Sequence, residues 1–164
     1  MKSKKIDTNQ RMVYDPSQEG YQLFRSPFYL IAHADFRYHE DVSAVLLKHG
    51  VNKSMYRIMT VLREAEPTSI SYLAEHALIK RNTVSRIVER MVELGFATTE
   101  PDPADNRITI VTLTTDGHTL LNTLTPVVAR QVKRAMQGIS DAALDQLVTT
   151  LQQIGENLAK LSIE

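Results

Sequence analysis

The sequence predicts a mainly α-helical fold with one small β-hairpin, in a chain of 164 residues. Two observations lead to this prediction. Apolar residues recur at three- and four-residue spacing over most of the chain, which is the period of a helix with one buried face. Between two such regions, residues 96–113 change to short segments rich in Thr, Ile and Val, separated by turn-forming residues.

The composition excludes several kinds of chemistry. The chain has no cysteine, so disulfides, thiolate nucleophiles and cysteine-ligated zinc are ruled out. No segment approaches the ~20 apolar residues that a membrane span requires, and no apolar segment of a secretory signal follows the basic start. We therefore expect a cytoplasmic protein with no membrane partner. The formal net charge is zero, so a surface that binds nucleic acid must be a local basic patch.

The first long helix is expected from about Pro27 to about His49. Ser26 is a typical N-cap, proline is tolerated at the first helical position, and Gly50 is a typical end signal. Residues 1–20 lack this periodicity and are interpreted as a flexible N-terminal arm. The apolar positions expected on the buried face are Phe24, Phe28, Ile31, Tyr38, Val42 and Val45.

Three shorter helices are expected next. Asn52 is a good cap for the first of them, and Ser69 or Ser71 for the second. The third begins near Lys80 and ends at Gly95. Its apolar stripe consists of Val84, Ile87, Val88, Met91 and Leu94.

A hairpin follows the third short helix directly. In its second strand, Ile108 and Ile110 are expected to alternate with Thr109 and Thr112, with Val111 as a further candidate for the apolar set. Three helices followed by a hairpin is the element order of a winged helix-turn-helix, a DNA-binding fold, which we assign to residues 52–113.

Two long helices complete the chain, the first with a kink expected at Pro126. A winged helix does not need the terminal helices, so their apolar stripes must be buried elsewhere. We expect residues 21–51 and 114–164 to form a helical dimerisation region with a second copy of the chain. An intramolecular bundle that caps a monomer is the alternative. The predicted fold class is thus a winged helix-turn-helix flanked by long N- and C-terminal dimerisation helices.

Polar and basic side chains gather at the start of the third short helix. A helix that enters the major groove needs such side chains for base edges and phosphates. We expect Arg86 on a guanine edge, Asn82 on an adenine edge, and Arg107 in the minor groove. The full set expected to bind DNA is Lys80, Arg81, Asn82, Thr83, Ser85, Arg86, Arg90, Asp105, Asn106 and Arg107. The alternatives are an ordinary solvated helix face and a local salt bridge between Asp105 and Arg107.

The central segment resembles the MarR family of bacterial regulators. The features that carry the resemblance are Leu73-Ala74, Val84-Ser85-Arg86, Gly95, Asp105-x-Arg107, and Leu113-Thr114 followed by Gly117. The resemblance implies a dimer with one wing per subunit, usually a repressor that a ligand releases from its operator.

The sequence departs from the family pattern in three places. Thr99 and Asn106 stand where many relatives carry basic residues, so wing contacts are expected to be weaker or differently distributed. The basic arm, with Lys2, Lys4 and Lys5, is expected to compensate. Lys80 also stands where a capping Ser, Thr or Asp is more usual.

The resemblance also implies a ligand site between the dimerising helices and the DNA-binding lobe. We therefore expect an aromatic or phenolic acid to bind polar and aromatic side chains of the first two helices. The expected set is Tyr29, His33, Phe36, Arg37, Tyr56, Met59 and Arg63. The alternatives are an aromatic core, an interior histidine, and pairing of Arg37 with Glu40 or Asp41. A metal site is not expected, because His33 and His39 are six residues apart and point to different sides of a helix.

Other function classes find less support. The sequence shows no Ser-His-Asp arrangement, no glycine-rich phosphate loop and no metal-binding helix motif, so we expect neither an enzyme nor a cofactor. A metal-responsive regulator and a winged helix that only contacts proteins remain as alternatives. The predicted function is a ligand-responsive regulator, a repressor that binds a pseudo-palindromic operator as a homodimer.

Overall fold

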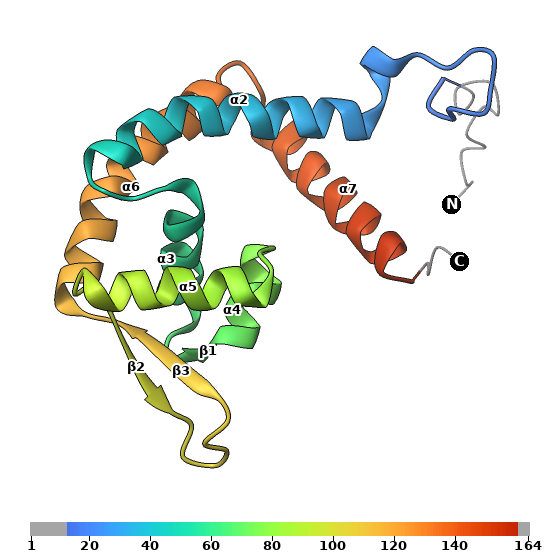
Figure 1. The fold of residues 1–164 in the computed structure, drawn as a ribbon. Helices are drawn as coiled ribbons and strands as arrows, with labels where there is room; N and C mark the ends of the chain where they lie inside the picture. Colours follow the sequence, from blue (N-terminus) through green and yellow to red (C-terminus); the bar gives the residue numbers. More distant parts are fainter. Residues whose placement is uncertain (1–12, 161–164) are drawn as a thin grey trace. The chain divides into compact units, whose positions relative to one another are not determined.

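The computed structural model describes residues 13–160. The helices and strands, in chain order, are η1 (Leu23–Arg25), α2 (Pro27–Lys48), α3 (Lys53–Ala65), β1 (Thr68–Ser69), α4 (Ile70–Ala77), α5 (Arg81–Glu93), β2 (Ala97–Pro101), β3 (Thr109–Leu113), α6 (Thr115–Ala135) and α7 (Asp141–Lys160) (Figure 1). The chain divides into two compact units, and the division falls between Gln131 and Val132 in the sequence. The predicted basic arm with Lys2, Lys4 and Lys5 lies outside the described residues. Among the described helices, none has the length and apolar character that crossing a membrane requires.

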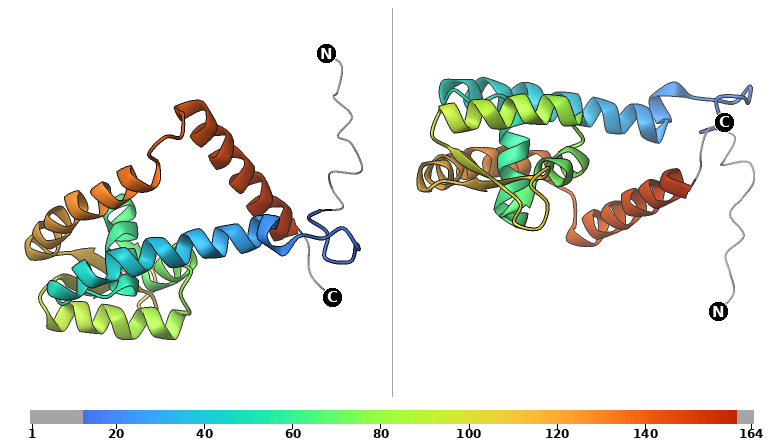
Figure 2. Two further views of the ribbon diagram at one scale, coloured as in Figure 1. Left: turned by 90° about the horizontal axis from the view of Figure 1, so that it is seen from above. Right: turned by 60° about the horizontal axis from the view of Figure 1, so that its bottom comes forward.

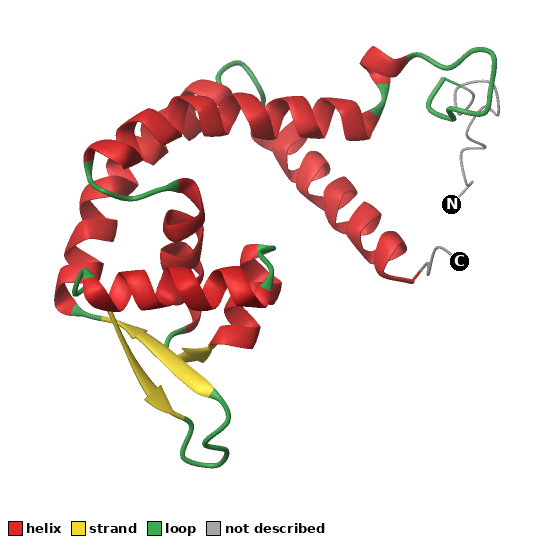
Figure 3. Cartoon of the chain, in the orientation of Figure 1, coloured by secondary structure: helices red, strands yellow, loops and turns green. Residues whose placement is uncertain are grey.

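The predicted fold class is confirmed: the chain is mainly helical with one small antiparallel sheet (Figure 3). The strand order is β1-β3-β2, so the central strand β3 pairs on both sides. Thr99 of β2 and Thr68 of β1 both face Val111 of β3 in the register. The strands β2 and β3 form the predicted wing. The strand β1 was not predicted, because two residues are too few to show an alternation.

The helix ends follow from local capping. The Asn52 side chain accepts a hydrogen bond from the Met55 N–H at 2.9 Å, and Ser69 Oγ accepts from the Tyr72 N–H at 3.1 Å. Lys80 occupies the N-cap position of α5 and supplies no side-chain cap. The helices α2 and α5 are each followed closely by a glycine with positive φ, which only glycine adopts without strain.

One hydrophobic core lies in the first unit, between α3, α4, α5, the sheet and α6. The fully buried side chains include Ile58, Leu62, Leu73, Val84, Val88, Met91, Val111 and Leu121. The expected apolar set of the second wing strand holds for Val111 but not for Ile108. Val111 and Leu113 are buried, whereas Ile108 is exposed, because the face of β3 that covers the helices carries the odd-numbered residues.

Gly117 lies where α6 packs closely on the turn between α5 and β2. A Cβ atom at Gly117 would lie 2.1 Å from the carbonyl oxygen of Phe96, closer than any real contact. The Thr114 hydroxyl donates to the Gly95 carbonyl at 2.6 Å and accepts the Gly117 N–H at 3.0 Å. The Leu113-Thr114 pair and Gly117 therefore fix the start of α6 against the turn that follows α5.

The long helices keep part of their apolar surface exposed. Val42 and Leu46 bury the second half of α2 in the core, while its first half extends beyond α3, α4 and α5 (Figure 2). Pro126 lies inside α6, which continues past it to Ala135. In the second unit, α7 has no buried residue. The exposed large apolar residues of η1, α2 and α7 are Leu23, Phe24, Phe28, Leu30, Ile31, Phe36, Leu47, Leu147, Val148, Leu151 and Leu158.

Candidate functional site

The first turns of α5 present a polar face outward. Asn82, Thr83 and Arg86 are exposed, whereas Val84 and Val88 are buried beneath them. This division follows from the 3.6-residue period, because the buried positions recur on one side of the helix and leave the other side to solvent. Asn82, Thr83 and Arg86, which were predicted to contact DNA, therefore share the outer face of α5.

Ser85 and Arg90 each have a hydrogen-bond partner on α5 itself. The Ser85 hydroxyl donates to the Arg81 carbonyl at 3.2 Å, and Ser85 lines a hollow between α5 and the sheet together with Thr99 and Thr109. Arg90 pairs with Glu93 at 2.8 Å, with both side chains exposed. An exposed ion pair of this kind contributes at most about 1 kcal/mol to stability. Arg90 can therefore exchange Glu93 for a phosphate as its partner at little cost in free energy.

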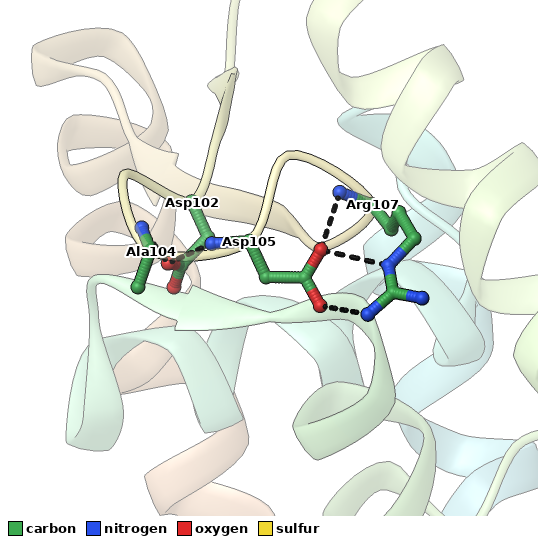
Figure 4. A network of polar contacts seen from close by, with 4 residues as sticks. All are labelled: Asp102, Ala104, Asp105 and Arg107. Carbon is green, nitrogen blue, oxygen red and sulfur yellow. Dashed lines mark hydrogen bonds and ion pairs between the residues drawn. The ribbon is translucent and has the colours of Figure 1, made fainter.

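The wing tip is ordered by its own carboxylates (Figure 4). Asp102 Oδ1 accepts the N–H groups of Ala104 at 2.7 Å and Asp105 at 3.2 Å. The Asp105 carboxylate accepts from the backbone N–H of Arg107 at 3.0 Å, from its Nε at 2.9 Å and from its Nη2 at 2.8 Å. Hydrogen bonds from Arg107 lower the pKa of Asp105, and the same pair raises the pKa of Arg107. The Arg107 side chain is 90% exposed and is held at the tip in a fixed direction.

A cleft of about 230 Å³ lies between α2 and α3 in the first unit. Its walls are aromatic and apolar, and three basic side chains face it. The lining residues are Tyr38, His39, Val42, Ser43, Leu46, Lys53, Tyr56, Arg57 and Thr60. Burial raises the pKa of both Tyr38 and Tyr56, so both phenols stay protonated at neutral pH and can donate hydrogen bonds.

His39 contacts both a basic and an acidic side chain at this cleft. Its Nε2 is 2.9 Å from Nη2 of Arg57 and 3.5 Å from Oδ1 of Asp35. Arginine only donates, so a hydrogen bond from Arg57 requires a lone pair on Nε2 and places the proton of neutral His39 on Nδ1. Protonation of Nε2 would exchange the Arg57 bond for an ion pair with Asp35. Burial lowers the pKa of His39, the Asp35 carboxylate acts in the opposite direction, and Lys53 and Arg57 lower it further.

The residues predicted to bind a ligand are distributed over several places. Tyr56 lines the cleft, and Met59 is fully buried in the core. Phe36 lines a shallower hollow that shares His39 and Lys53 with the cleft. The remaining four lie elsewhere, on α2 and α3.

Those four make contacts with their neighbours. The Tyr29 hydroxyl lies 3.0 Å from Nε2 of His33, on the first half of α2. Arg37 pairs with Glu40 at 3.8 Å, and Arg63 donates to Glu64 at 3.1 Å and to Thr125 at 3.4 Å. Across residues 13–160, no three acidic or histidine side chains lie close enough to hold a metal ion.

Sequence reasoning missed the basic residues of the cleft. Lys53, Tyr56, Arg57 and Thr60 follow one another at i, i+3, i+4 and i+7, which is one face of α3 opposite its buried stripe. This pattern was available in the sequence. The contribution of His39 was not, because it depends on how α2 crosses α3.

Comparison with known proteins decides the family. The MarR family model matches residues 49–108. The HTH-type transcriptional repressor IacR of Pseudomonas putida is 30% identical over 148 residues, which cover 90% of this chain and 89% of IacR. The chain belongs to the MarR family. Members of the MarR family are transcriptional regulators rather than enzymes.

Solved MarR structures have the same fold. A MarR family regulator from Silicibacter pomeroyi superposes with a TM-score of 0.77 at 22% identity, covering 87% of this chain and 94% of that one. BpsR of Bordetella bronchiseptica, whose DNA binding is regulated by 6-hydroxynicotinic acid, superposes with a TM-score of 0.73 at 21% identity, covering 82% of this chain and 96% of BpsR. The winged-helix fold of this MarR chain is thereby confirmed.

The histidine of the cleft should titrate abnormally. Burial favours neutral His39, so NMR should give a pKa below the ordinary value of 6.5. The stability of the fold should accordingly fall as the pH drops through 6.5, because the unfolded chain takes up this proton more readily. Asp35→Asn should lower the pKa further, and Glu40→Gln should leave it near its native value. A pKa above 6.5, or a rise in Asp35→Asn, would contradict these contacts.

Proposed function

We propose that this chain is a ligand-responsive repressor that binds a pseudo-palindromic operator as a homodimer and is released by an aromatic acid. The observation that carries the proposal is the exposed polar face at the start of α5, fixed from below by Val84 and Val88. Membership of the MarR family supports the regulatory role. Similarity to IacR, a transcriptional repressor, supports repression.

DNA binding is proposed through α5 and the wing. Asn82 and Arg86 have the donor and acceptor patterns that suit adenine and guanine edges in the major groove. Lys80 and Arg81, at the start of the helix, suit phosphates, and Arg107 on the wing suits the negative potential of a narrow minor groove. Because the chain has no net charge, this local set must supply the attraction to DNA.

Arg86→Ala tests the base contact. On a duplex selected from random sequences, we expect the variant to lose about 1–3 kcal/mol of affinity, with relaxed preference at one base pair. Lys80→Ala should weaken all sequences alike and reduce the salt slope of binding by about one. Fluorescence anisotropy at several salt concentrations measures both effects, with Arg130→Ala on α6 as the matched control. Failure to select any duplex would instead favour a winged helix that contacts proteins.

A homodimer is proposed because both units leave apolar surface uncovered. Phe24 of η1 is 74% exposed and Phe28 of α2 is 58% exposed. Val148 of α7 is 53% exposed. Large apolar side chains that are exposed in such number are typical of an interaction site. A second copy brings the same side chains, so a two-fold interface can cover both sets at once.

Phe28→Glu tests the dimer. A stable interface of about 1,200–2,000 Å² does not tolerate an unpaired carboxylate in its centre. Analytical ultracentrifugation at micromolar concentration should give a dimer for the native chain and a shift towards monomer for the variant. Asn122→Glu adds the same charge at an exposed polar position of α6 and serves as the control. A native chain that sediments as a monomer would contradict the proposal.

An aromatic or phenolic acid is proposed as the effector, bound in the cleft between α2 and α3. A volume of about 230 Å³ suits a single ring, and Tyr38, Tyr56 and Leu46 supply flat and apolar walls. Lys53 and Arg57 supply the cationic partners of a carboxylate. BpsR, which responds to 6-hydroxynicotinic acid, supports this chemical class.

Lys53→Met tests the position of the effector. We expect a panel of 6-hydroxynicotinate, benzoate and 4-hydroxybenzoate to contain an acid that raises the melting temperature, whereas the matching amides do not. A ligand at 100 times its Kd stabilises by about 2.7 kcal/mol. Lys53→Met should weaken binding at least about tenfold, as loss of a charged partner does. Arg37→Ala should leave the affinity for the acid unchanged. Weaker binding by Arg37→Ala, with native affinity in Lys53→Met, would instead place the site on the first half of α2.

A further inference from the structure

Arg57 lies between the cleft and the turn that joins α4 to α5. Its Nη2 is 2.9 Å from Nε2 of His39 on α2, and its Nη1 donates to the carbonyl oxygen of Ala77 at 3.3 Å. Ala77 is fully buried and is the last residue of α4. One side chain of α3 therefore contacts both the wall of the cleft and the end of the first helix of the helix-turn-helix.

The contact with Ala77 satisfies a helix end. The last carbonyls of a helix have no partner within it. Those of Ala74 and Glu75 receive backbone N–H groups from the residues that follow α4. Arg57 supplies a donor for Ala77, and its positive charge lies at the negative end of the helix.

The residues after α4 set the direction of α5. Leu78 has φ +54°, a left-handed conformation that residues with a side chain rarely adopt. Only Ile79 and Lys80 lie between Leu78 and the first residue of α5. Residues 78–80 thus join the end of α4 directly to the first turns of α5, which carry Asn82 and Arg86.

We infer that Arg57 couples the effector cleft to the recognition helix, an inference that rests on the proposed function. A carboxylate in the cleft offers two oxygens to the guanidinium group in the bidentate geometry that arginine favours. It draws Arg57 towards the cleft and away from Ala77, whose hydrogen bond is the longer of the two. The turn then loses its donor, and α5 leaves the orientation that binds DNA. By linkage, bound DNA weakens effector binding by the same factor.

Hydrogen exchange of the full chain, with neither acid nor DNA present, tests this coupling. In Arg57→Met, the amides of residues 78–84 should exchange about tenfold faster than in the native chain. A factor of about ten lies within the usual range of allosteric coupling. Arg57→Lys should restore native rates, because an ammonium group can still donate to the Ala77 carbonyl. Arg130→Met is the control with an exposed arginine on α6. The Met variant should also bind the selected duplex about tenfold more weakly without any acid.

Three results would overturn the coupling. The first is exchange in residues 78–84 within twofold of the native rate. The second is an equal acceleration at Thr109–Leu113, which indicates a general loss of stability. The third is faster hydrogen exchange in residues 78–84 of Arg57→Met together with an unchanged affinity for DNA. A panel of acids that binds nowhere overturns the effector site alone, because the exchange measurement involves no acid.

Discussion

The structure depends on the burial of one face of α5. Val84, Val88 and Met91 are fully or almost fully buried against the core, and each such side chain contributes about 1.5–3 kcal/mol when removed from water. Rotation of the helix about its axis would expose them. The same constraint that stabilises the domain therefore decides which side chains of α5 face outward, and the proposed DNA-binding surface is a consequence of the core.

The helix α3 has two distinct faces. Met55, Ile58 and Leu62 form the centre of the core. On the other face, Lys53 and Arg57 line the cleft against α2. A single helix thus belongs to the core that supports α5 and also lines the proposed effector site. In the proposed coupling, a local rearrangement of Arg57 acts on the end of α4 directly, through its hydrogen bond to the Ala77 carbonyl.

Local chemistry made much of the fold predictable. Asn52 and Ser69 were recognisable as caps, and the stripe from Val84 to Met91 identified the buried face of α5. The outward face followed from the same period. The short strand β1 and the buried face of β3 were not predictable, because both depend on pairing partners distant in the sequence.

The cleft was harder to predict than the recognition helix. A helix face is set by residues that are neighbours in the sequence, whereas the cleft requires α2 and α3 to cross. Tyr29 and His33 do lie next to each other as their spacing indicates, but on the part of α2 that extends beyond the core. His39 lies where the two helices meet, and its role depends on Arg57, eighteen positions away.

A crystal structure of the chain with a selected duplex tests the central claim most directly. The outward face of α5 should lie in the major groove in both copies, with Arg86 within hydrogen-bonding distance of a base and Arg107 of the wing beside the adjacent minor groove. A complex in which the duplex is bound elsewhere, with the start of α5 facing solvent, would contradict the claim.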